Sequence, residues 1–358
     1  MKKIGIVTLF GYNNYGNRLQ MFAVQKVFKN IGFDSEIVKY KMATTNEPFI
    51  IKIKIVIYYF LNLKFSLSKS YFKNCRIYNF RKHAKCYYSE SKNYVNPLKI
   101  ENDFQENYSF FSVGSDQIWG WFNYDIANFV FLQFAPKEKR ISFSPSFGSS
   151  IIDEKYRKIF TEGLNNFNNI SVREQTGADI VKDFTGKDAT VLCDPTMCLS
   201  KEEWLEFSST HKRKPKKKYI LTYFLGEPSL KVVEVLNDTP DEFEIVHLNS
   251  LKFSKFYSIT PSEWVDYIND ADLFLTDSFH GVVFSILLQT PFGVYSRVGG
   301  ESMHTRITNI LEKFNLQDRY EITSNDSSLF KMDFANTEEI INIEKSKVYN
   351  FLNLSLII

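Results

Sequence analysis

A single histidine stands where the chain could do acid–base chemistry. His280 lies in the segment TDSFHGVVFS, between a predicted strand and an apolar run that indicates a buried helix. Asp277 or Ser278 can cap this helix, and Gly281 would let a ligand approach the unpaired amides of its first turn, which favour an anion. Because imidazole titrates near neutrality, His280 could donate or accept a proton beside that anion. A hydrogen-bonded structural histidine is the open alternative.

A carboxylate and two tryptophans follow another predicted strand, in the segment GSDQIWGW. Gly114 clears space there, Ser115 adds a hydroxyl, and Asp116 could accept a proton from a substrate hydroxyl. Trp119 and Trp121 could stack on a sugar ring, but we favour packing in the core for both. For Asp116 an Asx turn is the alternative.

Arginines supply the candidate cations. Arg173 directly follows a predicted strand and precedes a helix, so its guanidinium should enter the ligand crevice, where its planar fork suits carboxylate or phosphate. A salt bridge to Glu174 or Asp194 is the alternative. Arg297 and Arg306 give a second cationic group near the same rim, although nothing in their spacing fixes the direction of their side chains.

The loop GYNNYGNR at 11–18 carries amide side chains at a helix N-terminus. It lacks the Lys and Ser/Thr that a P-loop needs, and it does not match G-x-G-x-x-G, so the sequence supports neither a triphosphate loop nor dinucleotide binding. Asn14 and Asn17 suit anions or sugar hydroxyls. Turn formation by Gly and Asn is an equal alternative.

The predicted elements place these residues at strand ends. Strand, helix and strand within residues 3–40 make a βαβ unit, which implies a parallel sheet. Ligands of such sheets bind beyond the carboxyl ends of the strands, where Ser144 also lies, at the start of SPSFGSS. The predicted strands are 3–9, 35–40, 109–113, 140–144, 169–173, 189–193, 218–225, 243–248, 272–276 and 291–295, and the predicted helices lie near 18–32, 152–165, 174–184, 229–237, 261–270, 280–288, 304–314 and beyond 337.

Two such series predict an α/β protein with two doubly wound, Rossmann-like domains that face each other across a cleft. We expect an N-terminal domain at 1–200 with a basic aromatic insertion at about 45–105, a C-terminal domain at 201–333, and a C-terminal helix at 334–358 that packs back on the first domain.

The insertion contains the most membrane-like stretch of the chain, FIIKIKIVIYYFLNL at 49–63. It is too short to span a bilayer and contains Lys52 and Lys54. The lysine-rich, aromatic region 48–90 could lie on an anionic bilayer surface. We favour a helical insertion that packs its apolar side on its own domain and leaves its lysines in water.

Composition narrows the class of protein. The 358 residues, 44% hydrophobic and 24% charged, suffice for two domains with cores of their own. A net charge of +3 argues against a dedicated nucleic-acid binder, although basic residues gather in HKRKPKKK at 211–218. The four cysteines form no C-x-x-C pair, which argues against structural zinc. Without a signal peptide, this cysteine usage predicts a cytoplasmic protein.

The strand-end segments together resemble the polysaccharide pyruvyl transferase family. The likeness covers most of residues 3–295, and the ordered set of segments is more specific than any one of them. The segments are GIVTLFGYNNYGNRLQMFAVQ, FSVGSDQIW, ISFSPSFG, ISVREQTGADIV, CDPTMCL and TDSFHGVVFSILLQTPF.

The resemblance implies a fold similar to the B-type glycosyltransferases. It also implies transfer of a pyruvyl group from phosphoenolpyruvate to a sugar of a cell-surface polysaccharide or its precursor, as a cyclic ketal with release of phosphate. His280 is then the candidate acid and Asp116 the candidate base. No metal or cofactor is required. The implied substrate-binding residues are Asn14, Asn17, Gly114, Ser115, Ser144, Arg173, Ser278, Gly281, Arg297 and Arg306.

One position departs from the family pattern, since many members carry arginine where this chain has Ser278. Arg297 or Arg306 would have to replace that anion contact. We expect phosphoenolpyruvate and a saccharide acceptor as partners and no nucleic acid; a lipid-linked acceptor at the inner face of the membrane is a further hypothesis. The alternatives are a nucleotide-sugar-dependent glycosyltransferase and a non-catalytic glycan-binding or assembly protein.

Overall fold

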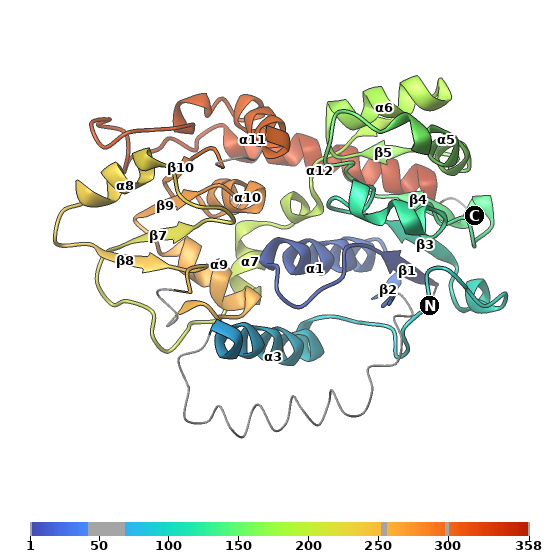
Figure 1. Ribbon diagram of the computed structural model, residues 1–358, viewed down its shortest axis with the longest axis horizontal. Helices are drawn as coiled ribbons and strands as arrows, with labels where there is room; N and C mark the ends of the chain where they lie inside the picture. Colours follow the sequence, from blue (N-terminus) through green and yellow to red (C-terminus); the bar gives the residue numbers. More distant parts are fainter. Residues whose placement is uncertain (1, 42–68, 252–255, 298–300, 357–358) are drawn as a thin grey trace.

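The chain folds around two parallel sheets, as the computed structural model shows for residues 2–41, 69–251, 256–297 and 301–356 (Figure 1). The first sheet has the order β2-β1-β3-β4 and the second β10-β9-β7-β8, while β5 and β6 pair separately. All of these pairs are parallel. The strands are β1 Lys3–Val7, β2 Asp34–Ile37, β3 Phe110–Val113, β4 Arg140–Ser142, β5 Ser171–Val172, β6 Thr190–Val191, β7 Tyr219–Tyr223, β8 Glu244–His247, β9 Leu273–Thr276 and β10 Phe292–Val294.

Helices connect the strands in both halves, as the alternating pattern predicts. The α-helices are α1 Tyr15–Asn30, α3 Lys69–Tyr87, α4 Ala127–Val130, α5 Arg157–Asn165, α6 Gln175–Thr185, α7 Lys201–Phe207, α8 Leu230–Asn237, α9 Pro261–Asn269, α10 Phe279–Leu288, α11 Glu301–Lys313 and α12 Thr337–Ser355. Short 3₁₀ helices include η3 Trp121–Ile126, η5 Glu154–Tyr156, η6 Pro195–Cys198 and η8 Gln317–Arg319.

Local sequence signals set several helix starts. Ser200 and Glu203 form a capping box that opens α7, and Thr260 and Glu263 form another that opens α9. Asn14 caps α1 by accepting a hydrogen bond from the Asn17 amide at 3.1 Å. These caps satisfy amides that would otherwise lack partners at the first turns.

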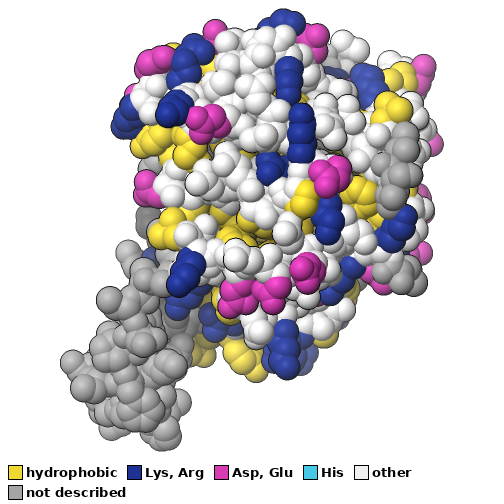
Figure 2. Space-filling view, turned by 90° about the vertical axis from the view of Figure 1, so that its right-hand side faces the viewer, with side chains coloured by type: hydrophobic (Ala, Val, Ile, Leu, Met, Phe, Trp, Pro, Cys, Tyr) yellow, Lys and Arg dark blue, Asp and Glu magenta, His cyan; other side chains and the backbone are white. Residues whose placement is uncertain are grey.

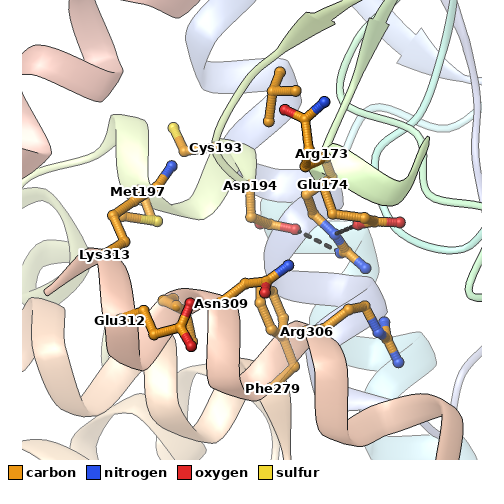
Figure 3. A pocket seen from close by; sticks show the side chains of 13 residues that line it. Arg173, Glu174, Cys193, Asp194, Met197, Phe279, Arg306, Asn309, Glu312 and Lys313 are labelled. Atoms are coloured by element: carbon orange, nitrogen blue, oxygen red, sulfur yellow. Dashed lines mark hydrogen bonds and ion pairs between the residues drawn. The ribbon is translucent and has the colours of Figure 1, made fainter. Parts of the chain in front are cut away.

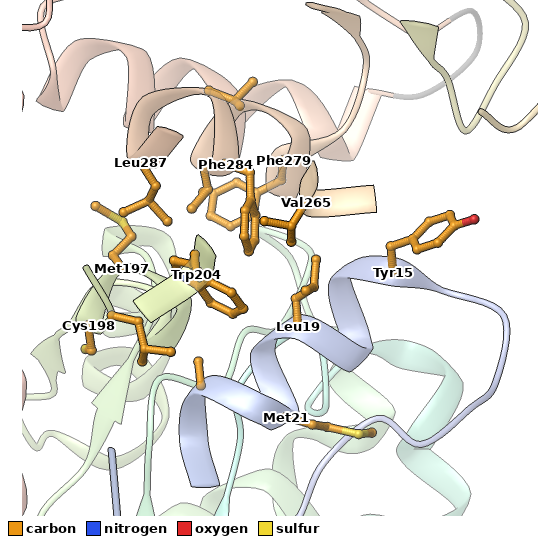
Figure 4. Packing of buried hydrophobic residues seen from close by; sticks show 14 of the residues in the cluster. Tyr15, Leu19, Met21, Met197, Cys198, Trp204, Val265, Phe279, Phe284 and Leu287 are labelled. Carbon is orange, nitrogen blue, oxygen red and sulfur yellow. The ribbon is translucent and has the colours of Figure 1, made fainter. Parts of the chain in front are cut away.

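A shared hydrophobic core joins the halves. Two smaller clusters of buried residues, around Phe111 in the first half and Ile220 in the second, are separate cores as expected. The largest cluster instead contains residues of both halves, from α1 and α7 to α9 and α10. Figure 4 shows Leu19 of α1 facing Trp204 and Val265 within it. The relative position of α1 and α10 is therefore fixed by packed side chains.

The C-terminal segment contacts both halves. Figure 1 shows α12 running across the top of the view from one half to the other. Lys313 of α11 pairs with Glu344 at 2.7 Å, and Asn30 of α1 donates to the Tyr349 hydroxyl at 3.4 Å. The domain boundaries given above stay predictions.

The insertion is described only in part. The stretch 49–63 lies outside the described residues, whereas α3 packs on α1 through Phe80 and Tyr15, whose ring centroids are 5.0 Å apart. This helix also reaches the second half, because Asn79 donates to the Ser258 carbonyl at 2.6 Å. We predicted that the insertion packs on the N-terminal domain, and α3 contacts the second half as well. None of the described helices is long and apolar enough to cross a membrane.

Candidate active site

The loops after β1, β3 and β4 interlock at one edge of the first sheet. Gln20 donates to the Thr8 hydroxyl at 2.9 Å and accepts from the Ser115 amide at 3.1 Å. Gly114 is required here, because a Cβ would overlap the carbonyl of Phe143. The Ser144 hydroxyl donates to the Cys193 carbonyl at 2.9 Å, which ties the loop to the segment after β6.

Two residues of these loops have strained backbones. Asp116 has φ of 60° and Ser144 has φ of 51°, in the left-handed region that non-glycine residues rarely adopt. The turn at Ser144 ends β4 at Ser142, earlier than the predicted strand 140–144. Such backbone outliers gather at functional sites.

Arg173 is surrounded by carboxylates. Its Nη1 lies 3.0 Å from Asp194 Oδ2 and 3.4 Å from Asp116 Oδ1, and its Nε lies 3.5 Å from Glu174 Oε2. The arginine is 7% exposed. Burial disfavours its charge, but the three carboxylates outweigh burial and raise the pKa of the guanidinium above its usual value.

The salt-bridge alternative for Arg173 therefore describes what the structure contains, and Glu174 and Asp194 both take part. The Asp116 carboxylate bonds Arg173 instead of forming an Asx turn. Trp119 lies in the core, as favoured, with its indole N–H donating to the Val130 carbonyl at 3.0 Å. The side chain of Trp121 lies outside the described ones.

His280 meets the same carboxylate from the second half. Its Nε2 lies 3.7 Å from Asp194 Oδ2, and the side chain is 10% exposed. The other edge of the ring packs against Gly16 of α1, where a Cβ would overlap the imidazole. Arg173 and His280, which lie in different halves, thus converge on one oxygen atom.

Asp194 is the centre of this cluster. Burial alone would raise the pKa of its carboxyl, but the imidazole of His280 and the guanidinium of Arg173 outweigh burial and hold the pKa below its usual range. Its Oδ1 accepts from the amide and hydroxyl of Thr196 at 3.1 and 2.8 Å. Asp194 is therefore ionised at neutral pH and can stabilise a protonated imidazole.

A cavity of about 470 Å³ opens beside the cluster (Figure 3). One wall carries Arg173, Glu174 and Asp194, and the opposite wall is α11. In Figure 3 the side chains of Arg306 and Asn309 project from α11 into the same space, with Phe279 between the two walls.

Arg306 is a buried cation in this cavity. Its pKa is lowered to about 10 by burial and by the neighbouring Arg173 guanidinium, although Glu174 and Asp116 act in the opposite direction. Arg306 therefore adds a buried guanidinium to the cavity wall that faces Arg173, Glu174 and Asp194.

The turn before α10 is held by its own residues. Ser278, and not Asp277, is the cap, since its hydroxyl accepts from the Gly281 amide at 3.3 Å. The Asp277 carboxylate accepts from Arg297 Nε at 2.9 Å and from the amides of Leu225 and Gly226 at 2.7 and 2.9 Å. A Cβ at Gly281 would overlap the Thr276 side chain, so packing requires this glycine rather than a close ligand.

In the loop 11–18, the amide side chain of Asn14 stabilises the start of α1. Asn14 is exposed and caps α1, which is the turn-forming alternative. The buried Arg18 fixes the loop, because it donates to the Gly11 carbonyl at 2.7 Å and pairs with Glu90 at 2.6 Å. The loop still lines the site through Gly16, which touches His280.

Two residues of the cluster received no chemical role from the sequence. Asp194 stands at a predicted strand end, where ligand contacts are expected, and was also an alternative salt-bridge partner of Arg173. Gly16 belongs to the strand-end loop after β1, but nothing in its spacing predicted the contact with His280. Among the described residues, no three His, Cys, Asp or Glu side chains are arranged to hold a metal ion.

Comparison with known proteins gives one family. The model of the family described as polysaccharide pyruvyl transferase matches residues 14–297. No curated protein sequence matches the chain.

The solved structures similar to this chain share its fold. A putative UDP-N-acetylglucosamine 2-epimerase from Listeria monocytogenes has a TM-score of 0.50 at 11% identity, covering 97% of this chain and 96% of that one. S. aureus TarM has a TM-score of 0.47 at 12% identity, covering 100% of both chains. At such identities the likeness shows the fold alone. The predicted fold, with two Rossmann-like domains as in the B-type glycosyltransferases, is confirmed.

Proposed function

The chain belongs to the polysaccharide pyruvyl transferase family, and from this premise we propose that it moves a pyruvyl group from phosphoenolpyruvate to a sugar diol as a cyclic ketal. The enol carbon gains one proton, two hydroxyl oxygens bond to the central carbon, and phosphate leaves with the second proton. The observation that carries the proposal is the meeting of His280 and Arg173 on Asp194 Oδ2.

His280 is the proposed acid. Its Nε2 makes no hydrogen bond with a described residue, and at 3.7 Å the Asp194 carboxylate is close enough to stabilise the imidazolium without taking its proton. The proton is thus available for the enol carbon. Asp116 is the proposed base for a sugar hydroxyl, held by Arg173 at 3.4 Å.

Arg306 is the proposed donor contact, with Arg297 beside it. Arg173 already faces three carboxylates, so a carboxylate or phosphate of the donor would meet excess negative charge there. Arg306 lines the same cavity from α11, and burial and the Arg173 guanidinium lower its pKa, so an anion beside it would stabilise its charge. This assignment replaces the expected grip of Arg173 on the donor, and it compensates for Ser278.

The test is incubation of the purified chain with phosphoenolpyruvate and a panel of saccharide acceptors, followed by phosphorus NMR. We expect release of inorganic phosphate that depends on the acceptor, and a fall of about 10²-fold or more for His280→Ala. Nucleotide sugars are included in parallel. Their consumption in place of phosphoenolpyruvate would refute the proposal in favour of a glycosyltransferase, and acceptor binding without turnover of either donor would favour a glycan-binding protein.

We also propose that the saccharide acceptor is carried on a lipid. A precursor carried on a lipid at the inner face of the membrane would require the chain to meet a bilayer surface. The exposed cations of α3 support such a contact.

A further inference from the structure

The helix α3 is strongly cationic. Its residues 69–87 contain six Lys or Arg and no Asp or Glu. Arg76 is buried and donates to Asn249 at 2.7 Å, whereas Arg81, Lys82 and Lys85 are exposed. Within the described part of the chain, these three exposed cations form no ion pair. Their charge therefore faces water.

The exposed cations share a face with aromatic side chains. Tyr71 and Tyr78 are 41% and 68% exposed. At 100° per residue, Tyr71, Tyr78, Lys82 and Lys85 lie within a narrow stripe of the helix, with Arg81 at its edge. We call these five residues the α3 stripe.

The opposite face of α3 holds the helix on the protein. Phe80 and His83 are buried against Tyr15 and Phe207, with ring centroids 5.0 and 5.4 Å apart. The α3 stripe consequently points away from the core. Figure 1 shows α3 below α1 and α9, and Figure 2, which faces the right-hand side of that view, shows Lys and Arg side chains at the lower edge of that face.

We propose that the α3 stripe docks the protein on an anionic bilayer. Lysine and arginine near a membrane surface attract acidic headgroups, and tyrosine is enriched at the level of the headgroups, because its ring is apolar and its hydroxyl is polar. Charge complementarity favours this occupant, since the stripe offers three exposed cations without an ion pair to a described residue, of which Arg81 also lies over the Tyr12 ring at 5.2 Å, and two exposed aromatic rings. The inference does not depend on the proposed chemistry.

The experiment is sedimentation of the full chain with vesicles of phosphatidylglycerol and phosphatidylcholine, or of phosphatidylcholine alone, in the absence of donor and acceptor. We expect binding only to the anionic vesicles, and loss of that binding in high salt. Lys82→Gln/Lys85→Gln should weaken binding about 25-fold, at about fivefold for each cation removed. Tyr78→Ser should weaken it further.

A matched control removes the same charge elsewhere. Lys216→Gln/Lys217→Gln changes two exposed lysines of the basic loop 211–218, which is outside α3, and should weaken binding by less than about fivefold. Equal losses in both double variants, equal binding to neutral vesicles, or no vesicle binding would overturn the proposal. Binding of dextran sulfate but not of anionic vesicles would also overturn it, in favour of an acidic polysaccharide. Failure here would leave phosphate release from phosphoenolpyruvate untouched.

Discussion

Asp194→Asn should separate the chemistry of the cluster from its packing. The substitution keeps the shape of a side chain that is 1% exposed and removes its charge. At an effective dielectric constant of about 20, unit charges about 4 Å apart interact by about 4 kcal/mol, and His280 Nε2 lies 3.7 Å from Asp194 Oδ2. Complete loss would be about 10³-fold in rate. Because the carboxylate of Asp116 remains in the cluster, we expect about 10²-fold.

The stability cost of Asp194→Asn should be smaller than for a typical buried pair. Arg173 loses a charged partner at 3.0 Å, which costs about 1.5–3 kcal/mol for a hydrogen bond to a charged group. It keeps two other carboxylates, so the low end applies. The folded variant should therefore be available for kinetics.

The assay is phosphate release from phosphoenolpyruvate across a range of pH. We expect the rate of Asp194→Asn to fall, because the imidazolium form of His280 loses the carboxylate at 3.7 Å. Glu174→Gln is the matched control, because it also removes a carboxylate from Arg173 but faces Ser146 instead of His280. An unchanged rate in Asp194→Asn, or the same rate loss and the same profile in Glu174→Gln, would refute the role given to Asp194.

Three further outcomes follow from the structure. Gly16→Ala should lower kcat by displacing the His280 ring, while Gly11→Ala, in the same loop, should not, because a Cβ there would meet only the Asn13 side chain at 3.4 Å; equal effects would contradict the contact. Arg306→Met should raise the KM for phosphoenolpyruvate about 10-fold or more with little change for the acceptor, and an effect on the acceptor alone would reassign it. Burial and the Arg18 cation lower the pKa of His83 to about 3, below the ordinary 6.5. The free energy of unfolding should therefore be highest above about pH 6.5 and fall as the pH decreases toward 3, by at most about 1.4 kcal/mol per pH unit. Denaturant unfolding of His83→Phe should show a weaker fall, and an identical fall would exclude His83 as the cause.

The sequence could predict the elements and the edge at which the site lies. Apolar runs such as KIGIVTL and the capping box at Ser200 are local signals, and the structure has β1 and α7 where they indicate. The residue at which a strand ends is harder to predict from the sequence. Ile141 and Phe143 favour a strand, but the next residue, Ser144, has a left-handed backbone. Local preference is overridden there by the hydrogen bond to Cys193.

The partners of each charge could not be predicted in the same way. Asp116, Asp194 and Arg173 each stand at a strand end, but the alignment of those ends decides which carboxylates surround the arginine. The sequence left the salt bridge and the free cation as open alternatives for Arg173. Three carboxylates within 3.5 Å of Arg173 decide for the salt bridge. We therefore propose Arg306 as the anion contact, although its spacing in the sequence gave no direction for its side chain.

The contact between Gly16 and His280 has a wider consequence, because it crosses the two halves at the point where they share a core. Leu19 lies one turn beyond Gly16 on α1 and packs in the same cluster as Val265 and Phe284 of the second half. Separating the halves here would expose this cluster, which opposes wide opening at the α1–α10 contact. Substrates must then enter beside the cluster, through the cavity below α11, where Arg306 stands at the wall. The proposed acid, His280, is thus positioned by the packing of the interface rather than by the closure of one domain on another.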